Sequence, residues 1–198
     1  MVEGMVELYA AAQQREATMA VVRPVSTFIL AASIRDAPYL MSARTLQISL
    51  VLLIPSADLR AAIATDSRFA MTAMSDLAGW YRSMVRHTKN LKLRNTRERI
   101  AAYLLRQSRL LDSAPGFTLP VEKRLLASYR GMTPENLSRA LKSLAEDGCK
   151  IDGQRVIITD RARFPALAPL SPLLDGPDPE ASQAGVRLPL PKTDAQTA

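Results

Sequence analysis

The segment EKRLLASYRGMTPENLSRALKSL, residues 122–144, constrains the fold more than any other part of the 198-residue chain. Gly131 stands between two runs of helix-forming residues, and glycine readily adopts the left-handed backbone conformation that a tight turn between helices needs. Thr133 is a good N-cap, and Pro134 at the first helical position removes only an N–H that has no intrahelical partner. The spacing predicts two short helices joined by a glycine turn.

The second of these helices divides its side chains between two faces. Three leucines at helical spacing form a stripe that is expected to be buried: Leu137, Leu141 and Leu144. Polar side chains occupy the opposite face of the first two turns: Glu135, Asn136, Ser138 and Arg139. A carboxylate accepts a hydrogen bond from cytosine N4, and a guanidinium forks onto guanine O6 and N7. The pattern predicts a helix-turn-helix whose second helix reads the major groove of DNA.

A weaker interpretation of the same residues stands beside this one. Helical hairpins with a glycine turn occur in proteins of many functions, and Glu135 and Arg139, four residues apart, could form an ordinary surface ion pair. The segment that follows, CKIDGQRVIIT (residues 149–159), favours the DNA interpretation. It predicts a β-hairpin about Asp152–Gly153, which would be the wing of a winged helix-turn-helix.

Residues 66–110 read as helix, because they contain no proline and a single glycine, Gly79. Within this stretch, apolar and small residues recur at alternating spacings of four and three: Ala70, Met74, Leu77, Tyr81, Met84, Thr88 and Leu91. Such a heptad seam is typical of two helices that supercoil, although the helix could instead pack on its own domain. All of these residues except Ala70 are expected to make dimer contacts. We expect Asn95 or Thr96 to break or cap the helix.

The balance of charge favours a polyanionic partner, because the formal net charge is +7 and the pI is near 9.9. Between Arg82 and Arg109 lie nine basic residues and one acid, Glu98. A run of this kind usually forms a solvated face. Beside a candidate DNA reader, contact of some of its members with phosphates becomes a further expectation.

Scarce residue types exclude whole classes of site. With one cysteine, Cys149, and one histidine, His87, the chain cannot form an internal disulfide and lacks the ligands for a zinc site. It has neither a glycine-rich phosphate loop nor a persuasive Ser/His/acid set, so we expect that it is not an enzyme. The longest apolar run, residues 48–55, is too short to span a bilayer, and Glu3 and Glu7 interrupt any secretory signal. These features indicate a cytoplasmic protein with no membrane partner.

Two stretches carry a resemblance to a known family. LRNTRERIAAYLL (residues 93–105) resembles the segment that leaves the dimerisation helix and opens the DNA-binding domain in the catabolite-activator / fumarate-nitrate-reduction (CRP/FNR) family of bacterial transcription regulators. ENLSR (residues 135–139) matches the E-x-x-S-R signature of the FNR branch. The resemblance runs from about Gly4 to Thr159 and is strongest from Leu91 to Ile158.

The resemblance implies roles for individual side chains. In the FNR branch the Glu, Ser and Arg of the signature read half-sites of the TTGAT type, so base reading is expected from Glu135, Ser138 and Arg139. Auxiliary and phosphate contacts are expected from four residues near them: Thr133, Asn136, Lys123 and Lys142. Two copies related by a twofold axis would read an inverted repeat. Family members contact RNA polymerase, which is therefore an implied partner.

The implied fold is α+β, with a partial β-roll of the cyclic-nucleotide-binding kind, a long dimerisation helix and a C-terminal winged helix-turn-helix. These parts are expected over residues 1–60, 61–94 and 95–163. The remaining residues, 164–198, hold seven of the 13 prolines and are expected to be a disordered tail. Apolar runs predict strands at residues 5–10, 18–24 and 45–54. The family's early strands have no counterpart, so the sensor domain is expected to be truncated at its N-terminus.

The sequence leaves the effector and cofactor unknown. An iron–sulfur cluster would need several cysteines. A cyclic-nucleotide site would need a Gly-Glu pair, which is missing, and Leu40 and Met41 stand about where its arginine would be, with Arg44 as the nearest substitute. Both cofactors are therefore disfavoured. Haem stays open on weak support with His87 as its candidate ligand, although a solvent-facing or interhelical histidine is the commoner case.

Arg130, directly before the glycine turn, departs from the family pattern, which has an apolar residue such as Leu there. Burying a guanidinium without a partner would cost on the order of several kcal/mol. Its aliphatic stem could lie along apolar surface while the charge reaches water. This residue puts the stability of the domain in question more than its DNA chemistry.

The sequence as a whole predicts a homodimeric, sequence-specific DNA-binding transcriptional regulator. The alternative is an interaction protein: a truncated family member that pairs with full-length regulators through the 66–94 helix and modulates them. Co-purification with a relative, together with weak DNA binding alone, would favour this alternative.

Overall fold

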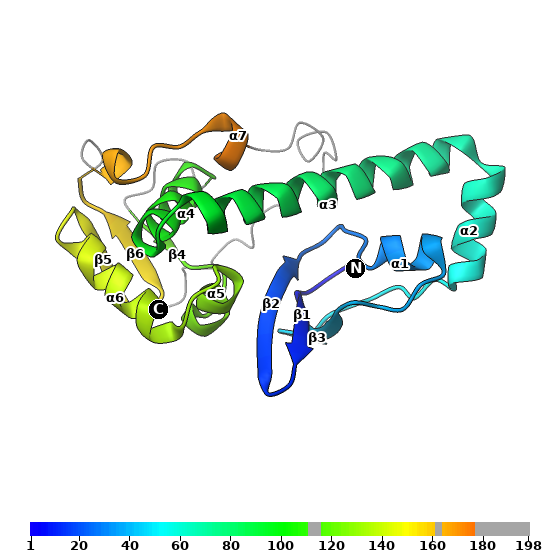
Figure 1. Ribbon diagram of the computed structural model, residues 1–198, viewed down its shortest axis with the longest axis horizontal. Helices are drawn as coiled ribbons and strands as arrows, with labels where there is room; N and C mark the ends of the chain where they lie inside the picture. The colour runs from blue at the N-terminus through cyan, green and yellow to red at the C-terminus, as the bar shows by residue number, and fades with distance from the viewer. Residues whose placement is uncertain (111–115, 161–163, 177–198) are drawn as a thin grey trace, which may run out of the picture.

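The computed structural model describes residues 1–110, 116–160 and 164–176. Figure 1 shows a small N-terminal sheet with helices α1 (Leu30–Arg35) and α2 (Ser56–Thr65), and a group of C-terminal elements. The sheet lies between α2 and the C-terminal group, and its strand β2 contacts helix α5 (Lys123–Tyr129) of that group. The long helix α3 (Ser67–Leu93) runs from α2 to the C-terminal group. The expected α+β class is confirmed. No helix of the described ranges is long and apolar enough to cross a membrane.

The N-terminal sheet has the order β2-β1-β3, with antiparallel pairing throughout. Its strands are β1 (Val6–Ala12), β2 (Arg15–Val22) and β3 (Ser42–Thr45). A small core of Met1, Val6, Leu8 and Val22 covers one side, and Trp80 of α3 packs against it. The predicted strands at residues 5–10 and 18–24 correspond to β1 and β2.

The strand predicted at residues 45–54 is wrong. Only Thr45 belongs to a strand, as the last residue of β3, and residues 46–48 form bends. Beyond them the chain is tied to residues 2–5 by a few backbone hydrogen bonds, including the isolated bridge between Glu3 and Leu50. Its apolar side chains stay in contact with solvent, and Ile48 and Leu53 are 101 % and 85 % exposed. Apolar composition predicts a strand only where a neighbouring strand supplies a continuous row of backbone partners. Helices α1 and α2 carry no strong local signal and were not predicted.

The long helix is bounded by side-chain caps. The Asp66 carboxylate accepts hydrogen bonds from the backbone N–H groups of Arg68 and Phe69, at 2.9 and 3.0 Å. Residues 61–65 belong to α2, so the long helix begins at Ser67 and not at residue 61 as expected.

The expected break between the two long helical stretches is confirmed, because α3 ends at Leu93 and α4 (Thr96–Leu110) follows it. Asn95 and Glu98 form a reciprocal capping box. The Asn95 Oδ1 accepts from the Glu98 N–H at 3.0 Å, and the Glu98 Oε2 accepts from the Asn95 N–H at 2.9 Å.

The C-terminal unit is a winged helix-turn-helix, as predicted. Helices α4, α5 (Lys123–Tyr129) and α6 (Pro134–Ala145) pack around a core that includes Leu104, Leu126 and Phe164. A three-stranded sheet of order β4-β6-β5 completes it, and its strands are β4 (Phe117–Thr118), β5 (Cys149–Asp152) and β6 (Arg155–Ile158). Strands β5 and β6 form the predicted wing.

The expectation that the chain is disordered from residue 164 onward is wrong for residues 164–176. Phe164, in the 3₁₀ turn η1 (Phe164–Leu167), and Ala168 are 0 % and 1 % exposed in the C-terminal core. A short helix, α7 (Pro172–Asp175), follows and packs against α3. Proline-rich composition did not reveal this packing, because burial of a few apolar side chains is enough to order a short segment. The rest of the predicted tail, residues 177–198, lies outside the described residues.

Candidate nucleic-acid interface

The turn between α5 and α6 has the predicted geometry. Gly131 has a φ of +64°, a backbone conformation that favours glycine, and a Cβ built on it would lie 2.7 Å from Cδ2 of Leu91, whose flexible side chain would have to shift. The Met132 N–H donates to the Ala127 carbonyl oxygen at 3.0 Å and closes the turn. The Thr133 Oγ1 then accepts from the Asn136 N–H at 3.3 Å, as an N-cap does.

Buried side chains fix how α6 is rotated about its axis. Leu137 and Leu144 are 1 % and 0 % exposed, and Ala140 and Leu141 are buried beside them. They face the core shared with α4 and α5. Because this stripe is anchored, the residues between its members must point away from the domain.

The three predicted base-reading residues lie on that outer face. Glu135, Ser138 and Arg139 are all exposed, within the first two turns of α6. Arg139 donates from NH2 to the Asn136 Oδ1 at 2.7 Å. Asn136 therefore holds the guanidinium one turn above the helix N-terminus.

The electrostatics of the outer face keep it ready to accept and donate hydrogen bonds. A hydrogen bond from the Thr133 side chain lowers the pKa of Glu135, with smaller contributions from its own backbone N–H and from Arg139. Glu135 is thus an anionic acceptor at neutral pH, four residues before a cationic donor. A face with one strong acceptor and one forked donor can discriminate between base pairs in a major groove.

The four expected auxiliary residues are less uniform. Lys142 is exposed on α6, two turns after Glu135, whereas Lys123 is half-buried at the first residue of α5. Thr133 and Asn136 use side-chain oxygens within the protein, for the helix cap and for Arg139. Lys142 is therefore the auxiliary cation that the structure leaves most open.

The expected dimer seam of α3 is largely exposed in the single chain. Met74, Tyr81 and Met84 are 53 %, 72 % and 41 % exposed, and Thr88 is also exposed. Leu77 is half-buried. Leu91 lies against the Gly131 turn of its own chain, so it differs from the rest of the seam. Trp80, which packs against the core of the N-terminal sheet, lies next to the seam, one helical turn from Leu77 and Met84.

Arg44, the nearest substitute for a phosphate-binding arginine, is engaged inside the N-terminal part. It donates from Nε to the Glu7 Oε2 at 2.6 Å and from NH2 to the Glu16 Oε2 at 2.8 Å, and its guanidinium stacks on the Tyr9 ring at 4.2 Å. Glu7 is 3 % exposed and also accepts from the Thr18 hydroxyl. These two carboxylates raise the pKa of Arg44 above its usual range. The Arg44 guanidinium is therefore already paired with the Glu7 and Glu16 carboxylates and not free to bind a phosphate.

His87, the candidate haem ligand, stacks on the Tyr129 ring with centroids 4.9 Å apart. Burial lowers the pKa of His87, and the charges of Arg130 and Arg99 lower it further. The imidazole is therefore neutral at pH 7 and packed between helices, which is the commoner case anticipated from the sequence. Within the described ranges, no three His, Cys, Asp or Glu side chains lie close enough to hold a metal ion.

Cys149 is a small buried residue of the C-terminal core. It is 0 % exposed in β5, and burial raises the pKa of its thiol to about 11. The side chain contributes to the core beneath the wing.

Sequence reasoning missed an ion pair that ties the end of α3 to α7. Arg94 and Asp175 side chains are each 8 % exposed, and both guanidinium NH groups donate to carboxylate oxygens at 2.7 Å. The partners lie 81 residues apart, so no local pattern reveals the pair. The run of basic residues from Arg82 to Arg109 is thus not purely a solvated face.

Comparison with known proteins agrees with this geometry. Residues 98–167 match the Crp-like helix-turn-helix domain, a span that holds α5, α6, the wing and most of α4. No curated protein matches the chain.

Several solved structures are similar to the chain beyond that span. FixK2 from Bradyrhizobium japonicum is 24 % identical, with 86 % of each chain covered and a TM-score of 0.66. A CRP-family transcriptional regulator from Thermus thermophilus is 20 % identical, with 89 % of this chain and 88 % of that chain covered and a TM-score of 0.65. A proposed cAMP-binding regulatory protein from Silicibacter pomeroyi is 28 % identical, with 85 % and 76 % covered and a TM-score of 0.56.

Proposed function

We infer that this chain, a transcriptional regulator of the CRP/FNR type by its helix-turn-helix domain and its fold, reads a TTGAT-like inverted repeat as a homodimer. One observation carries the proposal. Glu135, Ser138 and Arg139 lie exposed at the start of α6, while the leucine stripe on the other side of the helix is buried in the domain. Because the E-x-x-S-R signature is presented in this way, we assign the chain to the FNR-like branch.

The chemistry of the three side chains suits such a half-site. The Arg139 guanidinium would fork onto O6 and N7 of its guanine, and the Glu135 carboxylate would accept from N4 of the paired cytosine. Ser138 supplies a hydroxyl that can donate or accept. Phosphate contacts by Lys123, Lys142, Thr133 and Asn136 would position the helix without reading sequence.

The exposed seam of α3 would supply the dimer contact. Met74, Tyr81 and Met84 are apolar or aromatic and exposed over a helix of 27 residues, and a second α3 packed along it would bury them together. A twofold axis along the seam would place two α6 helices about one DNA turn apart, roughly 34 Å, in successive major grooves. An inverted repeat is the site that fits this symmetry.

The remaining parts of the proposal follow from this role. A regulator of transcription acts where DNA and RNA polymerase are, so we propose a cytoplasmic protein with that polymerase as partner. We do not propose that this chain binds cAMP, although the similar Silicibacter protein is described as cAMP-binding, because the Arg44 guanidinium is already hydrogen-bonded to the Glu7 and Glu16 carboxylates. The effector stays open.

The proposal is tested by fluorescence anisotropy with the purified chain and its Arg139→Ala variant. The wild type should prefer a TTGAT–ATCAA duplex over a scrambled duplex of the same length. Removing the guanidinium should cost roughly 1–3 kcal/mol on the repeat and much less on the scrambled duplex. Arg15→Ala, which removes one exposed charge from the β1–β2 hairpin, outside the proposed reading face of α6, is the matched control and should leave the preference unchanged. An unaltered preference in Arg139→Ala would refute the assigned role.

A second candidate function rests on the same exposed seam. The chain could pair through α3 with other regulators of this fold and modulate their DNA binding. Co-purification with such a relative, combined with unselective DNA binding by the purified chain alone, would favour this function over the first.

A further inference from the structure

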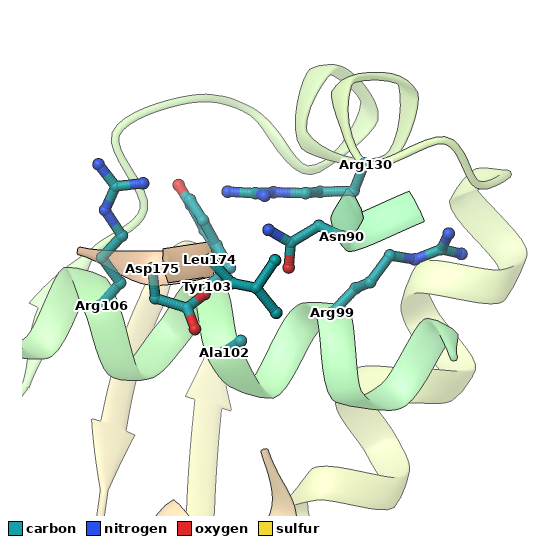
Figure 2. Close-up of a pocket in the computed structure, with 8 residues that line it drawn as sticks. All are labelled: Asn90, Arg99, Ala102, Tyr103, Arg106, Arg130, Leu174 and Asp175. Atoms are coloured by element: carbon teal, nitrogen blue, oxygen red, sulfur yellow. The ribbon is translucent and has the colours of Figure 1, made fainter. Parts of the chain in front are cut away.

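A small polar cavity lies where the long helix meets the DNA-binding domain. Figure 2 shows its lining, which comes from α3, α4, the end of α5 and α7: Asn90, Arg99, Ala102, Tyr103, Arg106, Arg130, Leu174 and Asp175. Its volume is about 20 Å³. A single water needs roughly 10–15 Å³, whereas a nucleotide-sized ligand needs hundreds, so the enclosed space holds about one water and a larger group must extend past the exposed Arg106 side chain.

The charges around the cavity are unbalanced. Arg99, Arg106 and Arg130 line it, against one carboxylate, Asp175. Both oxygens of that carboxylate already accept hydrogen bonds from Arg94, and one also accepts from the Ser171 N–H. Its charge is therefore neutralised by a fourth arginine. The Arg99 guanidinium donates to the Leu91 carbonyl oxygen and the Thr96 hydroxyl and points away from the other lining side chains. Arg106 and Arg130 form no salt bridge with a carboxylate among the described residues.

Arg130, the residue that departs from the family pattern, has the least satisfied guanidinium at the cavity. Its guanidinium carbon lies 4.5 Å from the Tyr103 ring centre and 5.1 Å from that of Tyr129. Its Nε is buried and has no hydrogen-bond partner in the described part of the chain. Aromatic faces attract a cation but accept no charge-assisted hydrogen bond of normal strength. The Arg130 guanidinium therefore does not reach water completely, as its aliphatic stem was expected to allow.

Two arginines of the cavity also oppose one another. Figure 2 shows the Arg106 and Arg130 guanidinium groups on either side of the hydroxyl end of Tyr103. Burial lowers the pKa of Arg130, and the charge of Arg106 lowers it further. An anion between them would replace this repulsion by two attractive contacts.

We propose that this cavity binds a small inorganic oxyanion, such as phosphate, between the guanidinium groups of Arg106 and Arg130, with the Tyr103 hydroxyl as a further donor. Planar guanidinium groups fit the oxygen spacing of phosphate by paired N–H contacts. Arg106 is exposed and stands at the open side, so the ion has an entry path. The site is separate from the outer face of α6 and does not depend on the proposed DNA function.

The bound anion would couple elements that are far apart in the sequence. Arg106 belongs to α4 and Arg130 to the C-cap of α5, while α3 and α7 form the remaining walls. An ion held by both arginines would favour the arrangement described here over one in which α5 moves away from α4. Because it binds the folded state alone, it should stabilise the chain in a saturable way.

The test is thermal unfolding of the full chain with increasing phosphate at constant ionic strength, with chloride as the replaced anion. The wild type should show a rise in Tm that saturates in the low-millimolar range, unlike the unsaturated effect of phosphate as an excluded co-solute. Arg130→Leu should abolish the saturable rise. Arg106→Ala, which removes an exposed side chain and leaves the core intact, should weaken it at least several-fold in phosphate concentration.

Two further variants locate the site. Arg109→Ala removes an exposed arginine from the same helix, one turn further on, and should respond like the wild type. Arg139→Ala should also respond like the wild type, because it lies on the outer face of α6. A Tm that does not depend on phosphate would mean that the cavity holds water and would overturn the proposal. Loss of the response in Arg139→Ala, or its persistence in Arg130→Leu, would overturn it as well.

Discussion

In the proposed DNA contact, Arg139 would act through the geometry of its guanidinium as well as through its charge. Asn136 accepts one of its N–H groups at 2.7 Å and leaves the others directed outward. Arg and Lys carry the same charge, but only Arg offers a planar fork that fits O6 and N7 of guanine together. The two contributions can therefore be separated by a single substitution.

Arg139→Lys should retain attraction to phosphates and lose discrimination. We expect the salt dependence of binding to change little, because the number of cations facing DNA is the same. Preference for guanine at one position of the half-site should fall by roughly 1–3 kcal/mol. Anisotropy titrations on duplexes with each base at that position, at two salt concentrations, measure both quantities. A lysine variant that keeps the wild-type preference would show that the fork is not used.

His87 gives the folded chain a stability that depends on pH. Its folded-state pKa is below the usual 6.5 because of burial, Arg130 and Arg99, so the unfolded chain binds the proton more readily. Above pH 6.5 the imidazole is neutral in both states and contributes no slope. As the pH falls from 6.5 toward the folded pKa, the free energy of unfolding should decrease.

His87→Phe should remove this part of the slope, because Phe keeps a ring against Tyr129 and cannot titrate. The measurement is urea unfolding between pH 7.5 and 5.5, with the variant compared to the wild type. His87 is the only histidine in the sequence, so no other imidazole contributes. Identical slopes for the two proteins would show that His87 titrates normally in the folded chain.

The four-residue helix α7 is held in place by a buried ion pair with the residue that follows α3. Arg94 and Asp175 form a buried, two-fold hydrogen-bonded pair, which closes the space beneath the α3–α4 break. Breaking such a pair from one side leaves an unpaired buried charge. Burial is the largest single influence and raises the pKa of Asp175, but the hydrogen bonds from Arg94 and the Ser171 N–H, together with the charges of Arg94 and Arg106, outweigh it, so the net shift of the pKa is downward.

Asp175→Asn should lower the free energy of unfolding by about 3 kcal/mol, at the low end for buried pairs because α7 is short and can detach. Chemical denaturation at neutral pH measures this. Asp36→Asn breaks the exposed pair with Arg60 and is the control, with an expected loss below about 1 kcal/mol. Equal losses in the two variants would mean that the buried pair holds nothing in place.

The elements differ in how far local sequence could predict them. Helix α4 starts at the Asn95–Glu98 capping box, and α6 starts at the Thr133 cap. In each case the capping residue and its partner lie within four residues of each other, so local sequence contains the signal. The Arg94–Asp175 pair and the segment at residues 46–54 depend on partners far along the chain. No local pattern contains that information, which is why the expectations for residues 164–176 and for the third strand were wrong.

The exposed face of α6, which we propose reads bases, could be predicted from local sequence, as α6 itself could. The leucines at positions 137, 141 and 144 fix which side of the helix is buried, and the polar residues between them then face outward. The cavity was not predictable as a site. Arg130 was visible as an anomaly in the sequence, but its closeness to Arg106 and Tyr103 follows from tertiary packing.

At the scale of the whole molecule, the proposed function requires two chains. Tyr81→Asp should convert the proposed dimer to a monomer, because a carboxylate at the centre of the seam would be buried against its own copy. Tyr81 is 72 % exposed in the single chain, so its loss should affect chain stability little. Ser83→Asp adds the same charge to an exposed position off the seam and is the control. Light scattering that gives a dimer mass for Tyr81→Asp would contradict the assigned seam.

The measurement that tests the central claim most directly is DNA binding by the wild-type chain to three duplexes of equal length. One carries the TTGAT–ATCAA inverted repeat, one has the second half-site reversed in direction, and one is scrambled. We predict tight binding by a dimer to the inverted repeat, with affinity at least tenfold lower on the other two. Equal affinity for all three duplexes would contradict sequence-specific reading by a symmetric pair of α6 helices.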